Sequence, residues 1–295
     1  MISPSEFVRS VHEEHAKQCG PLLQEMTAVL ANTAFPFPWI YLFELTQNAL
    51  DAGARRIRID FADDRVIFQH DGGEAMDEKC VRAMSKVGGS TKGLDTIGFM
   101  GVGFKSVFAR FRRVVVASGA FRFAYRISID VTGSAAWTGM LLPEWQEGSA
   151  APDQGYTTRF DLCDPAPESR GRLAEDALRL VPLEGPAHLL ATLAFKGLRE
   201  LIVDGRVWSL DYRAEEQIVE ALSHATRWVW LALSQRYRVH DDALTDFLSK
   251  RILSISKLEP DERRAQLNKD RQLIGFVPLS ADGLPDLPPR GAVFT

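Results

Sequence analysis

The stretch from Tyr41 to Ala54, YLFELTQNALDAGA, spaces its polar and apolar residues as an amphipathic helix does. Glu44 and Asn48 stand four positions apart and Asp51 follows three positions later, so their side chains share one helical face. The opposite face is apolar and can be buried, and Gly53 can end the helix. One interpretation is an ordinary helix with a solvated face. The other is a helix that presents an acid and an amide to a ligand.

A glycine-rich segment further along the chain supports the second interpretation, in which the helix faces a ligand. It is IGFMGVGFKS, with Gly98, Gly101 and Gly103 around a predicted helix start. Backbone N–H groups at such a start can hold phosphate oxygens. The segment has no GK[ST] sequence and no acidic residue at the distance expected of a dinucleotide fingerprint, which disfavours both common nucleotide folds. A tight loop without a ligand is the alternative.

The order of predicted elements indicates an α+β fold. Helices are predicted over residues 2–31, with a break at Gly20 and Pro21, and again over residues 76–87. Alternating patterns predict strands in RIRIDF, VIFQH, RVVVAS, FRFAYRIS and GYTTRFDL. After VIFQH, glycines permit a sharp turn and a close approach to a ligand. This order favours a two-layer α/β sandwich with a mostly antiparallel sheet and the helices on one face.

A second, partial α/β domain is predicted beyond a boundary near Pro186. Its first helix is GPAHLLATLAF, and a hairpin turns at Asp204 and Gly205 within RELIVDGRVWSLDY. The remaining predicted elements are the strand TRWVWLAL, the helices DDALTDFLSKRI and EPDERRAQLNKDR, and the strand LIGFVPLS. The chain therefore divides into residues 1–185 and residues 186–295.

Composition limits the partners and the compartment. The net charge of -4 gives no overall positive field that would favour nucleic acid or an anionic membrane. The 3 cysteines are far apart, which fits a reducing compartment. No apolar run is long enough to span a bilayer, and the N-terminus has no targeting signal. We therefore expect a cytoplasmic protein that does not enter a membrane.

Three segments, in this order, resemble the nucleotide-binding boxes of one superfamily: ELTQNALDAGA, DGGEAM and GFMGVGFKS. The superfamily is GHKL, which groups gyrase, the heat-shock-protein-90 chaperones, histidine kinases and MutL. The ending GFKS is most similar to the sacsin-like and microrchidia-like branches. The resemblance covers residues 40–163. It implies a Bergerat-type ATP-binding fold, with residues 1–185 as the ATP-binding domain and residues 186–295 as part of a transducer-like or middle domain.

The resemblance implies a role for each matching residue, with ATP and Mg²⁺ as ligands. Glu44 is the expected general base that deprotonates the attacking water, and Asn48 is the expected Mg²⁺ ligand. Asp71 is expected to accept a hydrogen bond from the adenine amino group, with Gly73 and Met76 packed beside the base.

Further positions are implied around the base and the phosphates. Thr158 resembles the threonine that supports Asp71, and Thr157 is the less favoured choice. The phosphate-binding segment, with its added positive charge, would consist of Gly98, Gly101, Val102, Gly103, Phe104 and either Lys105 or Lys92. A lid over residues 85–99 would close on the nucleotide. Asp51 would hold the lid or the helix, or form a salt bridge with an arginine.

The implied function is Mg²⁺-dependent binding and hydrolysis of ATP, which drives lid closure and a conformational change or dimerisation of a larger, chaperone-like protein. A carboxylate at Glu44 argues against a histidine kinase, since those kinases do not use an acid there to activate water. The lysine or arginine that completes the site in hydrolysing relatives is not identified in residues 186–295. The alternative is a nucleotide-gated binding module with negligible turnover. A purely structural domain is the third hypothesis.

The expected partners are an adenine nucleotide, a second copy of the chain or further domains of a longer one, and a protein or nucleic-acid client. A nucleic-acid client rests only on a group of arginines, for which we favour a solvated strand face. These residues are Arg110, Arg112, Arg113, Arg122 and Arg126.

Overall fold

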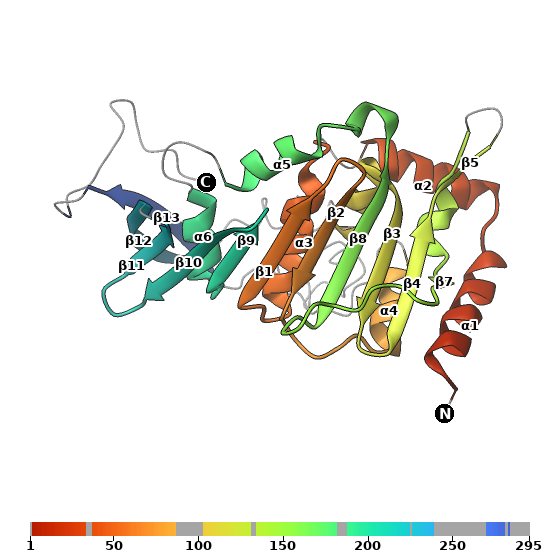
Figure 1. The fold of residues 1–295 in the computed structure, drawn as a ribbon, viewed down its shortest axis with the longest axis horizontal. Helices are drawn as coiled ribbons and strands as arrows, with labels where there is room; N and C mark the ends of the chain where they lie inside the picture. Colours follow the sequence, from red (N-terminus) through yellow and green to blue (C-terminus); the bar gives the residue numbers. More distant parts are fainter. Residues whose placement is uncertain are drawn as a thin grey trace.

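The computed structural model describes residues 2–33, 37–86, 103–130, 134–181, 188–224, 226–238, 270–280 and 283. These residues form a mixed α/β protein around one large sheet (Figure 1). The sheet has 11 strands in the order β13 (Asp270–Leu279), β12 (Thr226–Arg238), β11 (Ile218–Ser223), β10 (Arg206–Arg213), β9 (Glu200–Val203), β1 (Arg56–Phe61), β2 (Arg65–His70), β8 (Thr158–Pro165), β3 (Phe111–Ser118), β4 (Phe121–Arg126) and β7 (Glu144–Trp145). A second sheet pairs β5 (Ser128–Ile129) with β6 (Ala135–Ala136).

Neighbouring strands of the large sheet are antiparallel except at one junction. There, β9 runs parallel to β1, with Ile57 opposite Leu201 and Ile59 opposite Val203. The prediction of a mostly antiparallel sheet is confirmed, and the sheet is larger than predicted because strands from both predicted domains join in it. The expected boundary at Pro186 lies outside the described residues.

The predicted hairpin between β9 and β10 is confirmed. Asp204 and Gly205 both have positive φ angles, 48° and 74°, as a tight two-residue turn requires. The strands β10 to β13 then follow as antiparallel neighbours. The two helices predicted between TRWVWLAL and LIGFVPLS fall mainly on residues 239–269, outside the described part of the chain.

The helices of the structure are α1 (Pro4–Ala16), α2 (Pro21–Thr33), α3 (Ile40–Asp51), α4 (Glu78–Met84), α5 (Leu173–Leu180) and α6 (His188–Phe195). Three short 3₁₀ helices are η1 (Gly103–Ala109), η2 (Trp137–Leu141) and η3 (Pro167–Ser169). In Figure 1, α3 and α4 lie behind the sheet, and α6 packs on β10 and β11. None of the helices in the described ranges combines the length and the apolar character needed to cross a lipid bilayer.

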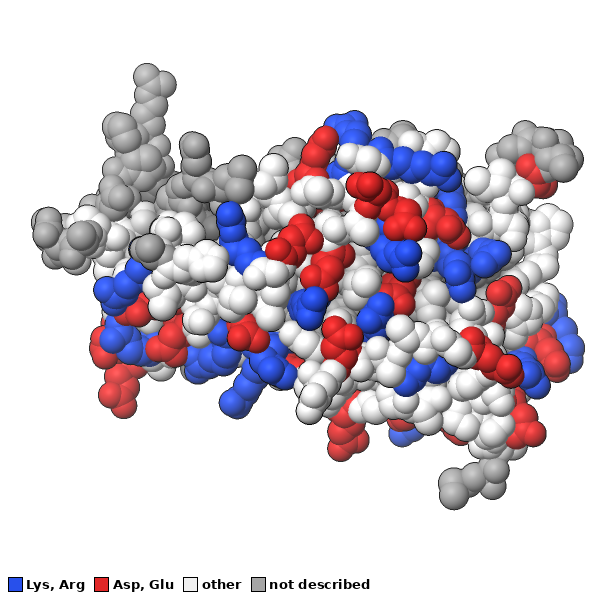
Figure 2. All heavy atoms as spheres, viewed as in Figure 1, with Lys and Arg blue, Asp and Glu red and all other residues white. Residues whose placement is uncertain are grey.

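The two faces of the sheet differ in polarity because side chains alternate along each strand. On the helix-covered face, Ile57 and Ile59 of β1 and Phe68 of β2 are fully buried in the core. On the open face, Arg58 and Asp60 alternate with them and form an ion pair at 2.7 Å. Figure 2 shows positive and negative side chains interleaved over this face.

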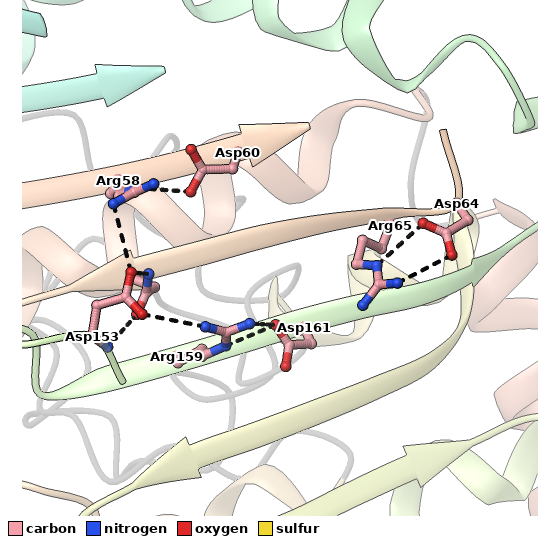
Figure 3. Close-up of polar contacts among 8 residues, drawn as sticks. Arg58, Asp60, Asp64, Arg65, Asp153, Arg159 and Asp161 are labelled. Atoms are coloured by element: carbon pink, nitrogen blue, oxygen red, sulfur yellow. Dashed lines mark hydrogen bonds and ion pairs between the residues drawn. The ribbon is translucent and has the colours of Figure 1, made fainter. Parts of the chain in front are cut away.

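The open face is tied together by charged side chains from several strands (Figure 3). Asp153 accepts a hydrogen bond from Gln69 at 2.9 Å and lies 3.6 Å from Arg58 and 3.5 Å from Arg159. Arg159 also pairs with Asp161 at 2.9 Å. Positive charges therefore have acidic partners here, so this network gives no sign of an anion-binding surface.

Candidate functional site

The helix α3 forms as predicted and divides its residues between the core and the site. Leu42, Leu45 and Ala49 are buried, whereas Glu44 and Asn48 are only partly buried on the other face. Gly53 follows the helix with a φ of 77°, a conformation that glycine adopts at little cost. The acid and the amide are therefore held four positions apart on a rigid helix.

The carboxylate of Glu44 lies directly against the end of the glycine-rich segment. A Cβ atom added at Gly103, where η1 begins, would stand 2.0 Å from Oε2 of Glu44 and 2.9 Å from its Cδ. A side chain at this position would therefore have to displace the end of the Glu44 side chain. The structure thus brings two segments together that the sequence singled out separately.

The turn after β2 packs just as closely on the end of α3. A Cβ at Gly72 would lie 2.5 Å from the backbone nitrogen of Ala54, and one at Gly73 would lie 3.1 Å from the carbonyl oxygen of Ala52. Gly73 also has a φ of 71°. Both glycines are needed for the turn to approach the helix end.

A row of buried polar side chains crosses three neighbouring strands at this end of the helix-covered face. Thr158 of β8 stands opposite both His70 of β2 and Ser118 of β3 in the strand registers. The Thr158 and Ser118 hydroxyls are 2.9 Å apart, and Ser118 Oγ accepts a hydrogen bond from the backbone N–H of Met76 at 3.0 Å. We call His70, Thr158 and Ser118 the polar row.

His70 is an uncharged member of the polar row. Its side chain shares the covered face with Phe68, and it is only 7% exposed. Burial lowers the pKa of His70 to about 4, and the nearby Asp71 carboxylate only partly opposes this shift. Nδ1 accepts a hydrogen bond from the backbone N–H of Gly72 at 3.2 Å, so the proton of the neutral ring sits on Nε2.

Asp71 lies at the junction of β1 and β2, and its role as the adenine acceptor stays a prediction. Its Oδ1 accepts hydrogen bonds from the backbone N–H groups of Arg55 and Arg56, both at 2.8 Å, and Oδ2 pairs with the Arg56 side chain at 3.3 Å. Strand alternation places His70 on the covered face at the end of β2. Asp71 instead joins that end to the start of β1.

Two neighbouring threonines, Thr157 and Thr158, lie next to this turn and make different hydrogen bonds. Thr158 bonds to Ser118, and Thr157 is the residue whose hydroxyl donates toward the turn, to the carbonyl oxygens of His70 at 3.2 Å and Gly72 at 2.9 Å. Support of Asp71 by Thr158 stays a prediction, and among the described residues the Thr158 hydroxyl lies against that of Ser118.

Lys105, which the resemblance offers as a cation for the phosphates, lies inside the protein. It is 1% exposed, and its Nζ donates to the carbonyl oxygens of Met84, at 2.5 Å, and Met140. The ammonium group also stands 4.7 Å from the centre of the Tyr125 ring. Lys105 therefore ties η1 to the end of α4, where the predicted lid begins.

Burial has a large effect on the pKa of the Lys105 amine. Desolvation by burial lowers the pKa of Lys105 from 10.5 to about 7. Ser85 is anchored beside it, with its hydroxyl 2.9 Å from that of Tyr125.

The phosphate-binding segment is described only at its end. Phe104 is partly buried, and its ring centre lies 6.0 Å from that of Phe160, which in turn lies 6.4 Å from the His70 ring. The aromatic rings thus connect η1 with the polar row. Lys92, Gly98, Gly101 and Val102, with most of the predicted lid, lie outside the described residues.

Sequence reasoning missed a buried charge network at the start of α3. The Tyr41 hydroxyl donates to Oδ2 of Asp176 at 3.0 Å, and Arg110 donates to Oδ1 at 2.9 Å. Arg110 was expected at most on a solvated or nucleic-acid-binding face, but it is 8% exposed. This network fixes α5 against α3.

The oxygen donors of α3 suit a magnesium nucleotide. Mg²⁺ keeps several waters and takes one or two protein oxygens together with phosphate oxygens. Glu44 and Asn48 offer such oxygens, and no group of three or more His, Cys, Asp or Glu side chains in the described ranges is placed to hold a metal ion by itself. The residues present therefore fit a metal that arrives with the nucleotide.

Comparison with known proteins assigns no family to the chain. Neither a protein-family model nor a curated protein matches the chain. Any function must therefore be argued from the residues described above.

Proposed function

We propose that the protein binds ATP with Mg²⁺ and hydrolyses it, and that the described strands and helices around α3 form a two-layer Bergerat-type sandwich. The observation that carries the proposal is the contact between Glu44 and Gly103. It places a partly buried carboxylate beside the segment whose sequence resembles a phosphate-binding loop.

The chain's own residues have distinct roles in this proposal. Glu44 accepts a proton from the attacking water at its carboxylate, and Asn48 supplies its amide oxygen to the metal. The backbone N–H groups of Gly103 and Phe104 face the phosphates. Bound Mg²⁺ neutralises phosphate charge during transfer. The polar row lies at the end where the base is expected, which supports a nucleotide spanning from α3 to the end of β2.

The wider role that we propose is based on the large sheet, in which strands from residues 1–185 and strands from residues 186–295 join. Residues 1–185 act as the ATP-binding domain, and residues 186–295 act as a transducer-like or middle domain. Because β9 pairs directly with β1, a change at β1 can pass to the second group through backbone hydrogen bonds. We propose that ATP-driven lid closure in a cytoplasmic, chaperone-like homodimer or longer chain acts on a protein client in this way.

The experiment that tests nucleotide binding is calorimetric titration of the protein with ATP in the presence of Mg²⁺. Asn48→Ala should weaken binding by about tenfold or more, because it removes a metal ligand. Gln47→Ala is the matched control, since Gln47 is also partly buried on α3 but is not assigned to the site. Absence of ATP binding at millimolar concentration would overturn the proposal. Binding without phosphate release would instead support the nucleotide-gated module.

A further inference from the structure

One buried carboxylate joins the helix that carries Glu44 to the element that begins at Gly103. Asp176 of α5 is only 4% exposed. Its Oδ2 accepts a hydrogen bond from the Tyr41 hydroxyl of α3 at 3.0 Å, and its Oδ1 accepts one from the Arg110 guanidinium, directly after η1, at 2.9 Å. The two oxygens of one side chain therefore bridge α3 and the end of η1.

Both partners of this carboxylate are fixed in the protein. Tyr41 is fully buried in the first turn of α3, and its ring packs edge-on against Phe111 of β3, with ring centres 5.2 Å apart. The Arg110 N–H donates to the carbonyl oxygen of Val107 at 3.1 Å, and the Arg110 carbonyl oxygen accepts from the N–H of Ala166 at 2.9 Å. Loss of the carboxylate bridge would therefore remove a direct tie between α3 and η1.

Tyr41 lies closer along the helix to the proposed catalytic base than to the proposed metal ligand. Glu44 is three positions after Tyr41, a rise of about 4.5 Å, whereas Asn48 is seven positions after it, a rise of about 10.5 Å. The Glu44 carboxylate lies against Gly103, the first residue of η1. A small shift of the first turn of α3 relative to η1 should therefore disturb this contact more than metal binding. Misplacement of a reacting group by about 1 Å can lower a rate by about a hundredfold.

We infer that Asp176 is a positioning residue of the proposed ATPase site, which holds α3 and η1 in the arrangement that places Glu44 at the start of η1. The inference rests on the proposed function, because it takes Glu44 as the base that acts on the attacking water. Asp176 acts through Tyr41 and Arg110. It lies outside residues 40–163, the part of the chain that carries the resemblance, so the resemblance assigns it no role.

The test measures phosphate release from ATP with Mg²⁺, together with the dissociation constant for ATP, in Tyr41→Phe. This variant detaches α3 from the carboxylate and leaves the ion pair between Asp176 and Arg110 in place. We expect phosphate release to fall by about tenfold while the dissociation constant changes by less than about threefold. Tyr212→Phe is the matched control, because Tyr212 lies in β10, in the second strand group, and both values should stay unchanged.

A double variant separates positioning of Glu44 from a general loss of packing. Gly103→Ala and Tyr41→Phe should both act on the position of the same carboxylate. The combined variant should therefore lose less phosphate release than the product of the two single losses. Independent, multiplicative losses would overturn the inference.

The outcomes separate this inference from the proposed function. Absence of phosphate release from the unmodified protein would overturn the proposed hydrolysis itself. Phosphate release that stays unchanged in Tyr41→Phe, with a thermal melting curve that shows a folded protein, would overturn the inference alone. A rise in the dissociation constant for ATP as large as the fall in phosphate release would also overturn it, because that result assigns the network to nucleotide binding and not to the base.

Discussion

Oε2 of Glu44 stands only 2.0 Å from the point where any side chain at position 103 would begin. This contact joins the middle of α3 to the first residue of η1, two elements that are remote in the sequence. A carboxylate held against backbone in this way can serve a reacting water, provided that nothing displaces it. The packing of position 103 is therefore directly linked to the proposed chemistry.

Gly103→Ala should lower ATP-dependent phosphate release by about tenfold or more, because the added methyl group must push the Glu44 carboxylate aside. Folding stability should change little, since the displaced atoms are the end of a flexible side chain. Gly20→Ala is the control, because a Cβ at Gly20 meets no atom within 4 Å. Unchanged phosphate release in Gly103→Ala would show that the position of Glu44 is not critical.

Gly72→Ala should lower the free energy of unfolding. Its Cβ would meet backbone atoms of Ala54 at 2.5 Å and 2.7 Å, which cannot rotate away. We expect a loss of about 1–3 kcal/mol in the free energy of unfolding, measured by urea denaturation and compared with Gly20→Ala. Equal denaturation midpoints for the two variants would mean that the turn does not press against α3.

Lys105 should make stability depend on pH in the alkaline range. Its pKa is about 7 in the folded protein and 10.5 ordinarily, so between these values the unfolded chain binds a proton that the folded chain lacks. Rising pH therefore stabilises the fold over this window, by at most about 1.4 kcal/mol per pH unit from this group, and the gain is lost as pH falls toward 7.

Lys105→Met is the matched variant for this window, because it keeps a long side chain and removes the titrating amine. Urea denaturation at about pH 7, 8 and 9 should show the stability of the unmodified protein rising relative to that of the variant. A stability difference that stays constant with pH would contradict the assigned burial of the amine.

Asp176→Asn should destabilise the protein by about 3–5 kcal/mol, because it leaves the buried Arg110 guanidinium without its counter-charge. Tyr41→Phe removes only one hydrogen bond to the same carboxylate and should cost about 1 kcal/mol. Glu175→Gln provides the control, since Glu175 pairs with Arg172 on the exposed side of α5. Similar losses for Asp176→Asn and Glu175→Gln would rule out a structural role for the buried pair.

The elements that local patterns determine were predictable. The period of apolar residues defined α3, and alternation defined β1 and β2 with their buried and open faces. Alternation also indicates where His70 lies, because Phe68 and His70 are two positions apart in β2 and must share a face. That signal assigns the covered face to His70.

The remaining features depend on contacts between distant parts of the chain. Lys105 is buried because the carbonyls of Met84 and Met140 converge on it, and neither residue carries a local signal of that role. The parallel pairing of β9 with β1 requires a crossover whose partner strand cannot be read from a periodic pattern. The same holds for the Tyr41–Asp176 hydrogen bond between α3 and α5.

The most direct test of the central claim is phosphate release from ATP and Mg²⁺ by the unmodified protein and by Glu44→Gln, with ATP affinity measured on both. Glutamine keeps the size of the side chain and removes its capacity to accept the water proton. We predict that phosphate release falls by about a hundredfold or more while the dissociation constant for ATP changes by less than about threefold. Equal rates of phosphate release in the two proteins would contradict the assignment of Glu44 as the catalytic base.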